Sequence, residues 1–194
     1  MRSGGNLTRS VLALAVALGG CTTMQRMKAP ELTGTPDATA LVIVEIQGKS
    51  HGAFGIPTGL NVQRAVLVSD DGTRPTVVGR PVAGFVVFSG LPAGGYQLQV
   101  VEAVRKVGQA TFRETFSVPA TSAAHGTVRA NPGEPNYLGI VTIDQRVGFR
   151  EQGVTFDLKV DKAAEVAAWE KFVEIYKGSP WVEDVNKKIV ALRR

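Results

Sequence analysis

The chain has 194 residues, of which 44% are hydrophobic and 20% are charged, and its formal net charge is +5. This balance is typical of a globular protein and excludes a wholly disordered chain. The positive excess is small and dispersed, so it does not indicate a protein that binds nucleic acid. A single cysteine leaves no partner for an internal disulfide, and burial alone must therefore hold the fold together.

Residues 1–20 have the pattern of a secretory signal peptide. Two arginines precede a short apolar run at residues 11–18, and Gly19 and Gly20 place small side chains directly before Cys21. The run is about half as long as the roughly 20 residues that a membrane-spanning helix needs. The pattern therefore predicts a signal peptide that is cleaved off rather than a permanent membrane helix.

The residues Leu18, Gly19, Gly20 and Cys21 resemble the bacterial lipobox. The resemblance implies cleavage between Gly20 and Cys21, attachment of acyl chains such as palmitate at Cys21, and a lipid-anchored lipoprotein of the cell envelope. Thr22 replaces the aspartate that would resemble an inner-membrane retention signal, which favours the outer membrane, facing the periplasm. Cleavage would remove Arg2 and Arg9 from the 22 basic residues. The mature chain would then have 20 basic and 17 acidic residues, a net charge of +3. Ordinary secretion with an unmodified Cys21 is the alternative.

The stretch after the cysteine has two prolines, few large apolar residues and no sustained period. We therefore expect residues 21–37 to form the lipidated N-terminus and a flexible tether. A β domain is expected at residues 38–160 and a helical hairpin packed on it at residues 161–194.

The β region contains short β-branched and aromatic runs separated by Gly, Pro, Asp and Ser, which is typical of an antiparallel all-β domain. Residues 41–46 are apolar on both faces and predict a central strand, whereas 96–100 and 154–160 alternate and predict strands with one wet face. Residues 69–72 (Ser-Asp-Asp-Gly) predict a hairpin turn. Roughly eight or nine strands without long helices between them favour a β-sandwich. The other strands are expected at residues 62–68, 76–78, 85–88, 112–118, 124–130 and 137–143.

Within this region, Phe88, Leu91, Tyr96 and Leu98 surround a Pro/Gly turn and predict a strand, a turn and a returning strand. The segment is similar to a hairpin of transthyretin-like and carboxypeptidase-regulatory-like sandwiches, some of them bacterial lipoproteins of unknown function. Residues 135–140 are similar to a later strand of those lipoproteins. The resemblance implies a transthyretin-like or immunoglobulin-like sandwich, and it brings no catalytic residues with it.

After residue 160 the hydrophobic period changes from two to about 3.6, which predicts two helices. Gly178 is expected to end the first helix, and Ser179 to cap a second one with Pro180 at its first position. The aromatic residues of this region are similar to one helix-turn-helix unit of tetratricopeptide-like periplasmic proteins. A single unit cannot form a repeat array, because each needs neighbours to bury its apolar face.

The aromatic side chains of this hairpin have two interpretations, because large aromatic residues dominate both cores and binding surfaces. In the first, the hairpin covers a sheet face or edge of its own domain. In the second, part of the stripe docks a partner protein in the envelope. The residues concerned are Trp169, Phe172, Tyr176 and Trp181.

Gly48, Lys49 and Ser50 invite comparison with a phosphate-binding P-loop, but that motif needs a glycine where Ile43 stands. The loop lysine is therefore expected to be an ordinary one.

Neither His51 nor His125 has a carboxylate or histidine at metal-ligand spacing, so no metal site is expected. Ser50, His51 and Asp70 could meet in space, but no nucleophile-elbow motif accompanies them. Asp70 and Asp71 would bind calcium only with further carboxylates nearby, which favours the turn.

The sequence thus predicts a lipid-anchored envelope protein that acts as a binding or scaffolding module. It is expected to have no catalytic activity and no cofactor, the membrane as partner through Cys21, and an envelope protein as a further partner. One alternative is an accessory lipoprotein of a secretion or envelope-assembly complex, because the type VI secretion lipoprotein is similar in fold. Another is a hydrolase or carbohydrate-active enzyme whose site the sequence does not reveal.

Overall fold

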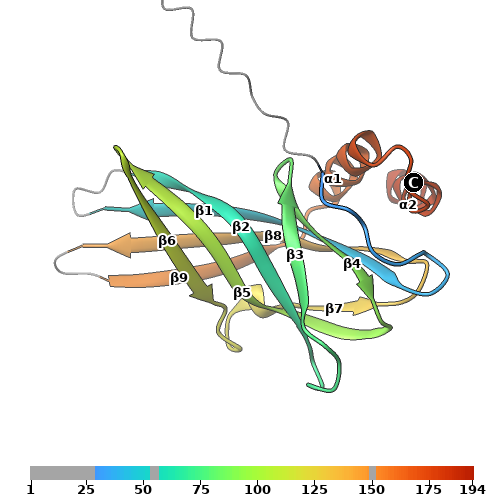
Figure 1. The fold of residues 1–194 in the computed structure, drawn as a ribbon, viewed down its shortest axis with the longest axis horizontal. Helices are drawn as coiled ribbons and strands as arrows, with labels where there is room; N and C mark the ends of the chain where they lie inside the picture. The colour runs from blue at the N-terminus through green and yellow to red at the C-terminus, as the bar shows by residue number, and fades with distance from the viewer. Residues whose placement is uncertain (1–28, 53–56, 149–151) are drawn as a thin grey trace, which may run out of the picture.

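The computed structural model describes residues 29–52, 57–148 and 152–194 (Figure 1). These residues form nine strands, a short 3-10 helix and two C-terminal helices, which confirms a mainly β chain that ends in helices. The elements are β1 (Ala40–His51), β2 (Pro57–Ser69), β3 (Val77–Val82), β4 (Phe85–Leu91), β5 (Gly94–Val107), β6 (Ala110–Ser117), η1 (Ala123–His125), β7 (Thr127–Ala130), β8 (Pro135–Val147), β9 (Gln152–Lys159), α1 (Lys162–Ile175) and α2 (Val182–Arg193).

The strands follow one another in the order β6-β5-β2-β3-β4-β1-β8-β9, and β7 pairs with β5. Strand β2 also pairs with the far end of β1, so β1, β4, β3 and β2 form a closed ring of pairings. In Figure 1, β6, β5 and β2 cross in front of β9, β8 and β1. The described strands therefore enclose a common interior between two layers.

The first strand is buried on both faces, as its apolar run predicts: residues 40–44 have no exposed surface. Its pairing with β4 is antiparallel, but its longest pairing, with β8, is parallel. The expectation of a purely antiparallel domain is therefore wrong at this strand pair. Parallel neighbours need a long connection, and here the whole of β2 to β7 supplies it.

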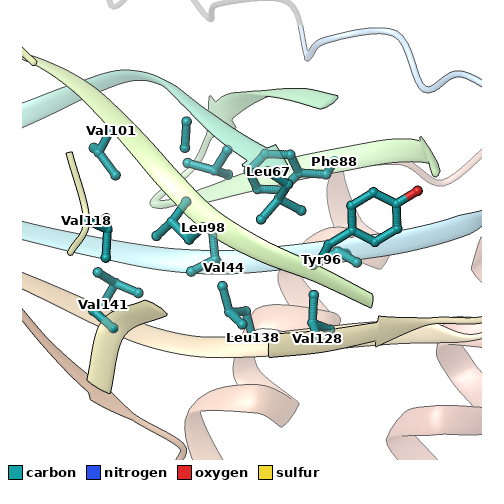
Figure 2. Close-up of a cluster of buried hydrophobic side chains, with 14 of the residues drawn as sticks. Val44, Leu67, Phe88, Tyr96, Leu98, Val101, Val118, Val128, Leu138 and Val141 are labelled. Atoms are coloured by element: carbon teal, nitrogen blue, oxygen red, sulfur yellow. The ribbon is translucent and has the colours of Figure 1, made fainter. Parts of the chain in front are cut away.

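The main core lies between the two layers (Figure 2). It contains the inward side chains of alternating residues, such as Val44 of β1, Leu67 of β2 and Leu98 of β5, as strand geometry requires. Val128 and Leu138 close it from β7 and β8. This burial supplies the main stabilising free energy of the fold.

The turn at residues 92–93 joins two layers rather than two paired strands. β4 ends at Leu91 and pairs with β1 and β3, whereas β5 begins at Gly94 and pairs with β2, β6 and β7. The expected returning strand therefore crosses to the other layer. The Tyr96 hydroxyl donates a hydrogen bond of 3.0 Å to the carbonyl oxygen of Pro92 and fixes this crossing.

Other local predictions have mixed outcomes. The turn after Ser69 is confirmed, with the Gly72 N–H donating to the Ser69 carbonyl and φ of +68° at Gly72. The strand expected at residues 124–130 instead begins as η1, and only β7 is extended. Most strands are longer than predicted, because the apolar alternation fades toward their ends while the backbone pairing continues.

The two helices cover the outer face of β1 and β4. Their apolar side chains form a second core with Leu41, Ile43, Phe85 and Val87, which point away from the main core. The Asp161 side chain caps α1 by accepting from the Ala164 N–H. Because α1, like α2, is short, no described helix is long and apolar enough to cross a membrane.

The connection between the helices differs from the prediction. α1 ends at Ile175 with Tyr176 as its C-cap, and Gly178 does not adopt a positive φ. α2 starts at Val182 with Trp181 as its N-cap. The Ser179 hydroxyl, in the turn before α2, accepts a hydrogen bond from the Trp181 N–H. Ser179 thus caps the turn that leads into α2 rather than α2 itself.

Ala29, Leu32 and Thr33 contact the domain, which differs from the flexible tether expected over these residues. The Thr33 N–H donates to the Ser89 hydroxyl at 2.9 Å, and the Thr33 hydroxyl donates to the Ser89 carbonyl at 3.1 Å. Leu32 and Ala29 pack against the second core. These contacts hold the first described residues against the second core and β4.

Candidate functional site

A cavity of about 350 Å³ opens where β2 separates from its neighbours. β3 pairs with β2 only at residues 65–67, and β1 pairs with β2 only at residues 57–59. Between these pairings β2 faces the β3–β4 hairpin across a hollow, which we call the strand gap. Its lining carries no charged side chain and consists of Pro30, Ile46, Leu60, Asn61, Val62, Gln63, Pro81, Val82, Ala83, Gly84, Phe85 and Val86.

Two features of the sequence reduce the number of backbone groups left without a hydrogen bond beside the strand gap. The Gln63 amide donates to the carbonyl oxygens of Asn61 and Val62, at 3.3 and 3.4 Å. Pro81, which has no N–H to leave unpaired, lies in β3 beyond its pairing with β2. A proline inside an otherwise β-like run was the one sequence signal that could have indicated this gap.

The turn that borders the strand gap is strained. Ala83 and Gly84 connect β3 to β4 with φ of +48° and +100°, and such two-residue turns favour Asn-Gly. Replacing Ala83 with asparagine should raise the free energy of unfolding by about 1 kcal/mol, because alanine tolerates the left-handed region poorly. Urea unfolding of the variant measures this. Ala93→Asn, at an exposed position without a positive φ, is the control and should give no gain.

A buried polar region lies at the end of the main core near the end of β1. Ser50 is fully buried, and neither its hydroxyl nor the Gln145 side-chain oxygen, on the adjacent strand, has a hydrogen-bond partner among the described residues. Arg105 and Glu114 form a mostly buried ion pair of 2.8 Å, and the Arg105 guanidinium lies 4.9 Å from the centre of the Phe112 ring. These groups form a polar layer over the apolar core rather than a constellation for acid–base chemistry.

The residues considered as a nucleophilic triad do not meet. Ser50 and His51 are neighbours in β1, so their side chains point to opposite faces. His51 Nε2 lies 3.3 Å from Asp144 Oδ1 on the outer face. Asp70 follows the opposite end of β2 from the end that pairs with Ser50.

The P-loop comparison also fails, because Lys49 lies inside β1, where β8 and β2 flank it. Its backbone is extended and paired, so it cannot form the loop that cradles a phosphate. Among the described residues no cluster of three or more His, Cys, Asp or Glu is placed to hold a metal ion.

The two aspartates of the β2–β3 turn interact with Arg74 rather than with a cation site. Arg74 Nη1 lies 3.1 Å from Asp71 Oδ2 and 3.9 Å from Asp70 Oδ1. The backbone N–H and hydroxyl of Thr73 donate to Asp71 and lower its pKa to about 2.

Thr73→Val tests this arrangement. The variant keeps the backbone donor but loses the hydroxyl, so the pKa of Asp71 should rise from about 2 toward its ordinary value of 3.8 without reaching it. An NMR titration of the Asp71 carboxyl carbon measures the change. Thr111→Val, on β6, serves as a control and should leave the Asp71 pKa unchanged.

The helical aromatic side chains do not form an exposed partner surface. Trp169, Phe172 and Trp181 are fully buried, Tyr176 is 8% exposed, and all four belong to the second core. The Phe172 ring contacts both Trp169 and Tyr176, with centroids 5.9 and 4.6 Å away. Burial raises the pKa of Tyr176 to about 12. The aromatic stripe thus covers the sheet of its own chain, because β1 carries apolar side chains on both faces.

The predicted lipidation and cleavage residues, Cys21 and Gly20, lie outside the described residues. The described chain begins at Ala29, and the next residue, Pro30, lines the strand gap.

Comparisons with known proteins give little further guidance. No protein-family model matches the chain, and no curated protein sequence matches it. Among solved structures, a leucine-rich repeat protein from Bacteroides thetaiotaomicron matches 70% of this chain and 16% of its own length. The identity is 14% and the TM-score is 0.34.

Proposed function

We propose that this protein is a lipid-anchored cell-envelope protein whose β domain acts as a binding or scaffolding module. The observation that carries the proposal is the series Leu18, Gly19, Gly20, Cys21 after a short apolar run. Two or more acyl chains on Cys21 would supply stable membrane anchoring. The absence of aspartate after the cysteine favours the outer membrane, with the domain facing the periplasm.

The domain itself fits the role of a rigid module, and we propose that it is a transthyretin-like or immunoglobulin-like sandwich. Two strand layers share one core, and the Tyr96 hydroxyl bonded to the Pro92 carbonyl supports this class, because a tyrosine tied to upstream backbone is common at sandwich corners. Asp71 and Glu114 form ion pairs with Arg74 and Arg105 of the same chain. The Asp71 pair stabilises the turn between β2 and β3, and the Glu114 pair joins β5 to β6, as a rigid module requires.

Cys21→Ser tests the anchor. The variant should lose incorporation of a palmitate analogue and should move from the membrane to the soluble fraction, because no thiol remains for acylation. Thr22→Ser, which keeps the cysteine, is the control. It should still incorporate the palmitate analogue and should still fractionate with the membrane. If the Cys21→Ser protein still carries the label and sediments with membranes, the lipid-anchor proposal is wrong.

The binding role needs its own experiment. Crosslinking of the anchored protein inside the envelope, followed by mass spectrometry, should recover one envelope protein reproducibly and in constant proportion. Recovery of only lipids and abundant porins would contradict a dedicated protein partner. A domain released by Cys21→Ser should crosslink to the same partner less efficiently, because it is no longer concentrated at the membrane.

A further inference from the structure

Strand β6 is an edge of the β domain that the described strands leave open. It pairs with β5 along all eight of its residues, without a register shift, and with no other described strand. It contains no proline, and its Phe112 side chain is 45% exposed. A regular edge strand of this composition offers unpaired backbone N–H and C=O groups to another chain. The same strand of a second copy would fit it, because antiparallel pairing of two identical edges is compatible with two-fold symmetry.

The opposite edge strand, β9, is covered by another part of the chain. The Ser122 hydroxyl donates to the Phe156 carbonyl oxygen of β9 at 3.4 Å, and the neighbouring η1 lies against the same strand. Outside β5, by contrast, no described residue forms a hydrogen bond with β6. If β6 is protected from other chains, the protection therefore comes from its own side chains.

β6 carries a charged residue on its inner face. Glu114 lies opposite Ala103 of the main core, so its side chain points inward with that residue. There it accepts a hydrogen bond of 2.8 Å from Arg105, and the Glu114 and Arg105 side chains are only 13% and 14% exposed. The other carboxylate oxygen of Glu114 is buried and has no hydrogen-bond partner among the described residues. Apolar residues of similar volume often stabilise a fold as well as such a buried pair does, so stability alone does not explain the charges.

We propose that the Arg105–Glu114 pair keeps β6 from pairing with a second copy of this chain. A strand added to β6 would place its own inward side chains beside Glu114 and would remove the remaining water contact of both ions, which is costly. Inward-pointing charged residues are one of the means by which edge strands avoid edge-to-edge association. The device belongs to the β domain alone, so its failure and the failure of the lipid-anchor proposal are separate results.

Sedimentation velocity of the full chain with Cys21→Ser, which avoids the need for a membrane, tests the proposal. Arg105→Met combined with Glu114→Leu removes both charges and should lower the dissociation constant of self-association by at least about tenfold. Arg64→Met combined with Glu102→Leu makes the same changes at an exposed ion pair between the paired strands β2 and β5. This control should associate no more than the unsubstituted protein. Equal association of the two variants, or no association of the first, would overturn the proposal.

Reversing the two charges shows whether the inward charge itself is responsible. Arg105→Glu combined with Glu114→Arg keeps an ion pair on the inner face and should remain as monomeric as the unsubstituted protein. Association of this variant to the same extent as the apolar one would contradict the proposal. Circular dichroism checks that each variant is folded. If the apolar variant is not, Arg105→Gln combined with Glu114→Gln repeats the test with side chains that are polar and uncharged.

Hydrogen exchange locates the contact between copies. In the variant without the two charges, the amides of residues 110–117 that point away from β5 should exchange more slowly as the protein concentration rises. The same amides of the unsubstituted protein should exchange at a rate that does not depend on concentration. Protection that appears on other strands, or protection of β6 in the unsubstituted protein, would show that the pair does not guard this edge.

Discussion

Trp181→Ala should lower the free energy of unfolding by about 3–5 kcal/mol, the usual cost of removing a buried tryptophan side chain. Trp181 has no exposed surface and belongs to the core between the helices and β1, so the substitution leaves a cavity there. Urea unfolding of the full chain with Cys21→Ser, which avoids the need for a membrane, measures the change. Val190→Ala, at a residue that is 52% exposed on α2, should cost far less.

A more conservative variant separates packing from hydrogen bonding at the same position. The Trp181 indole N–H has no hydrogen-bond partner among the described residues, so Trp181→Phe loses volume but no hydrogen bond. Its cost should fall well below that of Trp181→Ala. If both variants left stability unchanged while partner crosslinking was lost, the aromatic stripe would be a binding surface and its assignment to the core would be wrong.

Gly139→Ala should destabilise the protein by about 3 kcal/mol, because backbone strain and overpacking act together. Gly139 lies in β8 with φ of +123°, at the point where the register between β1 and β8 shifts. A Cβ atom there would lie 2.8 Å from the Lys159 carbonyl oxygen of β9, which is backbone and cannot rotate away. Thermal or urea unfolding measures the loss.

The matched control for this prediction is Gly153→Ala, in β9. A Cβ atom at Gly153 would meet nothing within 4 Å, and its φ is not positive. This variant should be neutral or slightly stabilising, because alanine restricts the unfolded chain. Equal effects of the two substitutions would show that the positive φ at Gly139 carries no strain.

The sequence predicted the nature of the elements better than their connections. Alternation and apolar runs indicated the strands, and the change of period near residue 160 indicated the helices, because these patterns depend on neighbouring residues. The layer crossing between Leu91 and Gly94 was missed, since a Pro/Gly turn looks the same whether its strands pair or separate. The Thr33–Ser89 contact joins residues 56 positions apart and leaves no local signal.

The candidate site was also missed, because it depends on contacts between residues that are distant in the sequence. The strand gap arises because the pairing of β1 with β4 ends at Glu45 and its pairing with β2 begins only at Lys49, which is a matter of register between distant strands. Only Pro81 marks it in the sequence. The sequence left open whether the aromatic hairpin covers its own domain or docks a partner, and only the packing of the helices on the outer face of β1 and β4 places it in the second core.

The parallel pairing of β1 with β8 has a consequence for biogenesis. Its partners are separated by more than ninety residues, for example Ile43 and Tyr137, so the apolar first strand emerges long before its neighbour. Such non-local contacts slow folding, and an unpaired apolar strand is prone to aggregation in the meantime. A chain that is exported before it folds would therefore need its first strand shielded during transit, and holdase chaperones on either side of the membrane are the natural means.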